Sequence, residues 1–169
     1  RRFSRKDAGL FPESPASSSH NPGSAPESYD LIISNPPWGD KKKKQARGEM
    51  PFITSRESFS YFLVRAYRML RRGGQVRFLL PESVLNVRQH ADIRRYLLGE
   101  NALAGVHFFG QVFSGVTTGC LALTLEQTER PAAEIAVRGR GADYSVPREE
   151  LGYGLHSVFP LLREEDRRI

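Results

Sequence analysis

A short apolar run that ends in an Asn-Pro-Pro turn constrains the fold of this chain more than any other feature. Leu31-Ile32-Ile33 favours a strand, and Pro36 and Pro37 end it because proline has no backbone N–H for a sheet ladder. A continuous apolar run without polar alternation is typical of a strand buried on both faces. The sequence therefore predicts a strand over residues 30–34 inside a parallel sheet.

The segments after this turn alternate between helix and strand patterns. Apolar residues recur every three to four positions from Phe59 to Leu70, which predicts a helix with Ser55 or Ser58 as N-cap and Gly73-Gly74 at its end. This order of elements predicts an α/β fold with a largely parallel sheet and right-handed crossovers. The remaining elements are predicted as a strand over 75–80, a helix over 87–98, and strands over 103–109, 119–127 and 133–138.

Composition divides the chain and excludes several classes of protein. Residues 1–28 are rich in Ser, Pro and Gly and lack the apolar surface for a core, so we expect a loop or linker there. Residues 29–127 carry the alternating elements, and residues 128–169 form an extension with weaker patterns. No apolar run approaches the ~20 residues of a membrane span. The single cysteine, Cys120, excludes a disulfide framework and fits a reducing compartment, so we expect a cytoplasmic protein.

The charge balance favours an anionic partner. Lys and Arg number 25 against 19 Asp and Glu, a net charge of +6 that suits nucleic acid. Most of these basic residues are Arg, so the composition of the source genome explains the excess equally well. In the run that starts with Lys41 and Lys42, contact with phosphate and a solvated loop are both open interpretations.

The Asn-Pro-Pro-Trp turn is the candidate site, because ligands bind at the carboxyl ends of strands in such sheets. Pro36 and Pro37 stiffen the turn before a ligand arrives. The Asn35 side-chain oxygen and the Pro36 carbonyl are then two fixed acceptors, and the Trp38 ring is a stacking face. This arrangement suits a planar group with an exocyclic amino group, such as adenine. The alternative is a simple turn after a buried strand, since Asn and Pro are common in turns.

The sequence around this turn resembles a known family. Residues 30–38 are similar to motif IV, the (D/N/S)-P-P-(Y/F/W) signature of S-adenosylmethionine-dependent amino-methyltransferases, and the Asn form resembles the N6-adenine DNA methyltransferases of restriction–modification systems. The helix–Gly–strand unit over 59–80, the segment over 83–98 and the motif VIII region over 110–125 extend the resemblance. It implies the C-terminal half of the catalytic domain over 29–127: a partial class I methyltransferase, Rossmann-like, with a mostly parallel sheet and an antiparallel last strand.

The resemblance implies direct methyl transfer from S-adenosylmethionine to adenine in DNA. Asn35 and the Pro36 carbonyl would accept the two N6 hydrogens of a flipped adenine, and Trp38 would stack on the base. Phe113 matches the aromatic residue that the family places against the flipped base, and its alternative is a core residue. The first residues of a target-recognition segment are one interpretation of residues 128–169.

Part of the family pattern is absent from this sequence. The Gly-rich loop and the acidic residue that hold the cofactor normally precede motif IV, and Asp7 is a faint match to the family's motif III acid. We therefore expect the chain alone to be catalytically silent, to need the N-terminal half of a catalytic domain as partner, and to self-associate through the edge of strand 30–34.

Other functions remain open at this point. The same chemistry serves methyltransferases that act on protein glutamine or rRNA, and a non-catalytic half-domain could bind nucleic acid or another subunit. We predict no metal site, because His90 on a helix surface and His107 in a strand have no partners at metal-ligand spacing. Cys120 fits a small core residue better than a nucleophile.

Overall fold

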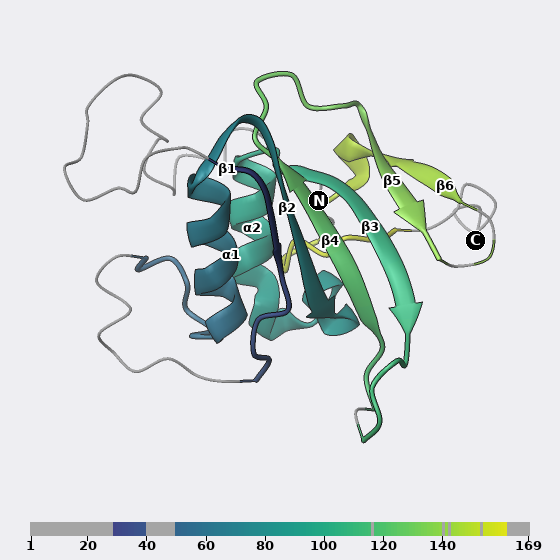
Figure 1. The fold of residues 1–169 in the computed structure, drawn as a ribbon. Coiled ribbons are helices and arrows are strands. Elements are labelled where there is room, and N and C mark those ends of the chain that lie inside the picture. Colours follow the sequence, from purple (N-terminus) through teal and green to yellow (C-terminus); the bar gives the residue numbers. More distant parts are fainter. Residues whose placement is uncertain are drawn as a thin grey trace.

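The computed structural model describes residues 29–39, 50–115, 117–139, 141, 143–152 and 154–161. Within these residues, six strands form one sheet in the order β1-β2-β4-β3-β5-β6 (Figure 1). Helical segments connect the first three strands, and no described helix is long and apolar enough to cross a membrane. The elements are β1 (Tyr29–Ser34), α1 (Ser58–Arg68), β2 (Leu70–Pro81), η3 (Glu82–Leu85), η4 (Arg88–His90), α2 (Ala91–Gly99), β3 (Leu103–Gly110), β4 (Cys120–Glu126), β5 (Glu134–Arg138), β6 (Tyr144–Pro147) and η5 (Arg148–Glu150).

Four of these strands run in one direction. β1 pairs with β2 in parallel, and β3 pairs with β5 in parallel. β4 lies between β2 and β3 and is antiparallel to both, while β6 is antiparallel to β5. The prediction of an α/β fold is confirmed, and so is the antiparallel strand expected over residues 119–127. The sheet is mixed rather than mostly parallel, because three of its five strand pairings are antiparallel. The parallel directions bring the ends of β1, β2 and β3 to one edge, which we call the carboxyl edge (Figure 1).

The two α-helices lie on one face of the sheet and bury the core there (Figure 1). The 3–4 residue spacing predicted for the first helix is confirmed, because α1 turns its apolar side toward alternate residues of β2. Deeply buried members of this core are Phe59, Leu63 and Val64 of α1, Val76, Phe78 and Leu80 of β2, Ile93 and Leu97 of α2, and Leu121, Leu123 and Leu125 of β4.

The opposite face of the sheet is not covered by any described helix. The intervening residues of the strands point toward it and leave apolar side chains in solvent, with Ile33 71%, Leu31 49% and Phe109 45% exposed. A broad depression runs across this open face from β1 to β5, and small residues form its floor: Ala104, Gly105, Ala122, Thr124 and Ala136. A face of this kind normally packs against another layer of structure.

The junction between α1 and β2 differs from the prediction. Glu57 is the N-cap of α1, and the helix ends at Arg68 with β2 following from Leu70. The glycine pair therefore lies inside β2, where Gly73 has a φ of 76°. A Cβ on Gly74 would lie 2.6 Å from the carbonyl oxygen of Tyr29, so glycine is needed where β2 passes the bulged start of β1.

Residues beyond 127 continue the same sheet. The strand expected over 133–138 is present as β5, whereas β6 had no counterpart in the prediction. The chain then returns to η3, where the backbone N–H of Phe159 donates to the Leu85 carbonyl at 3.0 Å.

Arg94 of α2 fixes this returning segment. Its side chain is fully buried, and its three nitrogens donate to the carbonyl oxygens of Val84 (2.7 Å), His156 (2.8 Å) and Ser157 (3.0 Å). Burial lowers the pKa of the guanidinium to about 10, because desolvation penalises the charged form. Arg94 thus joins α2, η3 and the segment after β6.

Candidate functional site

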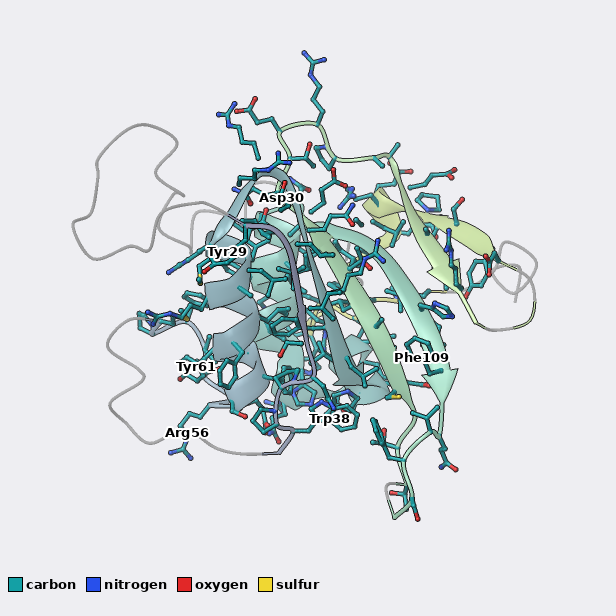
Figure 2. The ribbon with its side chains drawn as sticks, in the orientation of Figure 1. Tyr29, Asp30, Trp38, Arg56, Tyr61 and Phe109 are labelled. Carbon is teal, nitrogen blue, oxygen red and sulfur yellow. The ribbon has the colours of Figure 1, made fainter. Side chains whose placement is uncertain are left out.

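The Asn-Pro-Pro-Trp turn leaves β1 at the carboxyl edge of the sheet. Asn35 and Pro37 are exposed, Pro36 is buried, and Trp38 is half-buried. Asn35 also lines the depression on the open face. Figure 2 shows Trp38 at the lower end of the sheet, where the carboxyl ends of the strands lie. The turn therefore presents one exposed amide and one aromatic ring at the edge where parallel sheets bind their ligands.

The Trp38 ring joins three parts of the chain at one point. Its Nε1–H donates to the carbonyl oxygen of Leu79 in β2 at 3.1 Å. Its ring meets Phe113 of the β3–β4 loop edge-on, with the ring centroids 5.8 Å apart and the planes at 75°. Phe113 is 40% exposed, so it is a surface residue of this loop and not part of the core.

The backbone of the turn is held from the side of α1. The Ser58 hydroxyl donates to the Pro37 carbonyl oxygen at 2.8 Å. Ser58 is the first residue of α1 and is fully buried, and α1 has no side-chain hydrogen bond at its N-cap. The expected capping role of Ser58 is therefore wrong, because its hydroxyl is directed at the turn instead of the helix.

A buried polar layer supports the start of α1. Gln89 donates to the Glu57 carboxylate, and the backbone N–H of Ser55 donates to Asp92 Oδ2 at 2.7 Å. His90 is 8% exposed and lies against the Phe59 ring with centroids 5.2 Å apart. The interpretation of His90 as a helix-surface residue is wrong, because the short helix η4 turns it inward before α2 begins.

The predicted site residues divide into two groups. The structure brings Trp38 and Phe113 into contact beside Asn35. Lys41, Lys42 and Asp7 lie outside the described residues. Sequence reasoning missed the part that the Leu79 carbonyl and the Ser58 hydroxyl take in holding the turn.

The other side chains that could bind a metal or act as a nucleophile do not form a second site in the part of the chain that is described. No group of three His, Cys, Asp or Glu side chains there could hold a metal ion. Burial raises the pKa of the Cys120 thiol, and the nearby Glu82 carboxylate raises it further. Cys120 is thus a poor nucleophile, as expected for a core residue.

Two aromatic rings at a steep angle beside an exposed amide can hold a flat heterocycle. The amide oxygen can accept a hydrogen bond from an amino group, and the Trp38 indole offers a π-face. The depression on the open face is lined by Arg77 of β2, Arg138 of β5 and Glu126 of β4, so it carries charges of both signs. The arrangement suits binding and orientation of an amino heterocycle more than acid–base catalysis.

The sequence matches a family of DNA-modifying enzymes. The sequence model of the Eco57I restriction-modification methylase family matches residues 5–113. The chain is also 26% identical over 105 residues to the type II methyltransferase M.VspI of Vibrio sp. (strain 343). That match covers 60% of the chain and 26% of M.VspI.

Solved structures agree with the fold. The methyltransferase subunit of a type I restriction-modification system from Streptococcus thermophilus is similar at a TM-score of 0.56 and 19% identity, over 78% of this chain and 32% of that one. A structure described as a class I S-adenosylmethionine-dependent methyltransferase from Listeria monocytogenes has a TM-score of 0.55 and 17% identity, over 64% of this chain and 36% of that one. The sheet is therefore of the class I methyltransferase type, and the chain spans about a third or less of the length of these proteins.

The described carboxylates bear on where S-adenosylmethionine could bind. Class I folds hold the ribose of a nucleotide cofactor with a carboxylate next to a Gly-rich turn. Among the described carboxylates, Asp30 pairs with Arg71 near the start of β1, away from the carboxyl edge. Glu82 directly follows β2 at the carboxyl edge, and its carboxylate lies against Gly119. Glu57 and Asp92 are buried within the layer below α1.

Proposed function

Because this chain belongs to the Eco57I restriction-modification methylase family, we propose that it supplies the base-binding part of an enzyme that methylates the N6 amino group of adenine in DNA. The methyl donor in this proposal is S-adenosylmethionine. One observation carries the proposal more than any other: the Trp38 and Phe113 rings meet at the carboxyl edge, and Trp38 belongs to the same turn as the exposed Asn35.

Asn35 and Pro36 orient the amino group in this proposal. The Asn35 side-chain oxygen and the Pro36 carbonyl accept the two N6 hydrogens of adenine. Both hydrogens would then be held in place, and the nitrogen lone pair would leave conjugation with the ring and become available to the methyl group. As the N–C bond forms, the sulfur–methyl bond of S-adenosylmethionine would break and leave S-adenosylhomocysteine, and N6 would release one proton to solvent. The amino group is activated in this way by positioning and electrostatics, without a strong base.

Trp38 and Phe113 hold the base outside the duplex. Adenine within a duplex cannot reach such a site, and extruding it costs a few kcal/mol. Stacking on an aromatic side chain returns about 1–3 kcal/mol per base, so the Trp38 face offsets much of this cost. The planes of the Phe113 and Trp38 rings meet at 75°, which suits a second contact at the rim of the base.

Cofactor binding is assigned to the N-terminal half of a catalytic domain. The chain spans 26% of M.VspI, and the open face and the outer edge of β1 lack a partner among the described residues. DNA is the second proposed partner, favoured by the net charge of +6, with Lys41 and Lys42 as candidate phosphate contacts.

The test is methyl transfer by the chain joined to a cofactor-binding half from the same family. Asn35→Ala should lower kcat on adenine-containing duplex DNA by about a hundredfold or more, with the Kd for S-adenosylmethionine nearly unchanged. Asn86→Ala, at an exposed position beyond η3, is the matched control and should keep normal turnover. Normal turnover by Asn35→Ala would remove Asn35 from its role. Methylation of a glutamine peptide or of rRNA in place of DNA would contradict the choice of substrate.

A further inference from the structure

We propose that Ser58 is a positioning residue that fixes the plane of the Trp38 ring before a base arrives. The inference rests on the proposed function, because it concerns the ring that receives the base. Ser58 does not touch the base itself. It acts through the peptide group between Pro37 and Trp38.

The contact from Ser58 fixes one end of the tryptophan. Its hydroxyl donates to the Pro37 carbonyl oxygen at 2.8 Å, across 21 positions of sequence. A peptide group is planar, so a hydrogen bond to its oxygen sets the orientation of the whole Pro37–Trp38 peptide. The Cα of Trp38 belongs to this plane, so the bond restricts the position from which the side chain leaves the backbone.

The contact with Leu79 fixes the other end. The indole N–H of Trp38 donates to the Leu79 carbonyl at 3.1 Å. Ser58 belongs to α1 and Leu79 to β2, so the ring is held between two elements that pack on each other in the core. A stacking face held in this way loses little freedom when a base binds, which is how preorganisation increases affinity and rate.

Ser60 shows that the contact of Ser58 is not a general property of buried serines in α1. Ser60 is also fully buried in this helix, yet its hydroxyl has no hydrogen-bond partner among the described residues. Removing the Ser60 hydroxyl therefore changes the packing of α1 by one atom without touching the turn. It is a matched control for removal of the Ser58 hydroxyl.

The single tryptophan of the chain makes a direct test possible. Trp38 is the one tryptophan in the sequence, so the intrinsic fluorescence of the 169-residue chain reports on this ring. We expect Ser58→Ala to shift the emission to longer wavelength and to increase quenching by acrylamide, because the ring loses one of its two fixed ends. Ser60→Ala and Ser58→Thr, which retains a hydroxyl at position 58, should keep the wild-type spectrum. Equal emission and quenching in Ser58→Ala and wild type, at equal far-UV circular dichroism, would overturn the proposal.

A second variant keeps the proposal testable if Ser58→Ala does not fold. Ser58→Cys keeps nearly the same volume with a weaker donor. It should quench to an intermediate degree, and wild-type quenching in a folded Ser58→Cys would contradict the role of the hydrogen bond.

The reaction provides a readout that separates this inference from the proposed function. In the chain joined to a cofactor-binding half, Ser58→Ala should lower kcat by about ten- to a hundredfold with the Kd for S-adenosylmethionine unchanged, and Ser58→Thr should restore it. Normal kcat in Ser58→Ala would refute the positioning role while leaving the proposed function intact. Absence of methyl transfer in the wild type, together with the fluorescence differences, would refute the function and leave the structural role of Ser58 in place.

Discussion

Trp38 combines a donor and a stacking face in one side chain, and variants can separate the two. Trp38→Ala should weaken capture of the flipped base by about 1–3 kcal/mol, or roughly five- to 150-fold in affinity. Trp38→Tyr should be tolerated, because it keeps a π-face and a polar tip. Trp38→Phe should fall between them, since it keeps the face and loses the donor to Leu79. A fluorescent adenine analogue at the target position, titrated with the complete enzyme, measures this order, and equal affinity for all three would contradict it.

Cys120 offers a test of the core next to this site. The thiol is 1% exposed, and burial together with Glu82 raises its pKa, so at any given pH less thiolate is present than in a free cysteine. We expect the native chain to react slowly with a thiol reagent at pH 8 and rapidly in denaturing urea. Reaction of the native chain at the rate of a free thiol would show that the β4 end of the sheet opens.

At the residue scale, the sequence predicts the Asn-Pro-Pro-Trp turn but not the side chains and carbonyls that hold it in place. Asn35 to Trp38 form a contiguous motif whose stiffness follows from two prolines. The hydroxyl of Ser58 has a local option, to cap the helix, and a distant one, the Pro37 carbonyl. Local rules favour the first option, and the packing of α1 against the turn selects the second. His90 illustrates the same limit, because its burial depends on how η4 precedes α2.

At the scale of elements, the Arg94 contacts predict how firmly the segment after β6 is held. Arg94→Ala leaves three carbonyls without their donor inside the protein, and should lower the free energy of unfolding by about 3 kcal/mol. Arg95→Ala is the control next to it, since Arg95 is half-buried and donates to Leu155 at the surface. That change should cost less than about 1 kcal/mol. Urea unfolding followed by circular dichroism measures both, and equal losses would contradict the special role of Arg94.

The elements themselves follow from periodicity wherever a strand or helix has a buried side. The helix over 59–70 and the strands over 103–109 and 119–127 were predictable because buried residues recur periodically in α1, β3 and β4, between residues that are partly buried or exposed. The start of β2 before the glycine pair was not predictable from the sequence. Such a pair usually ends a helix, and the close approach of Gly74 to Tyr29 is a tertiary contact. β6 has four residues, too few for a periodic pattern to appear.

At the scale of the whole molecule, the open face and the β1 edge predict the behaviour of the chain on its own. Ile33 is 71% exposed on that face, and β1 is the outer strand of the described sheet. We expect self-association in light scattering and no saturable S-adenosylmethionine binding in calorimetry. Adding an N-terminal half from the same family should restore a defined complex and binding. A stable monomer with micromolar affinity for the cofactor would contradict this prediction.

The position of β4 also has a consequence for biosynthesis. β4 is made after β2 and β3, yet it is inserted between them. While the chain emerges from the ribosome, β2 and β3 each keep an unpaired edge until residues 120–126 arrive, a state that invites wrong pairing and chaperone binding. Insertion of β4 closes the β3–β4 loop and brings Phe113 to Trp38. A nascent chain that stalls before Cys120 therefore contains both aromatic residues and has no site.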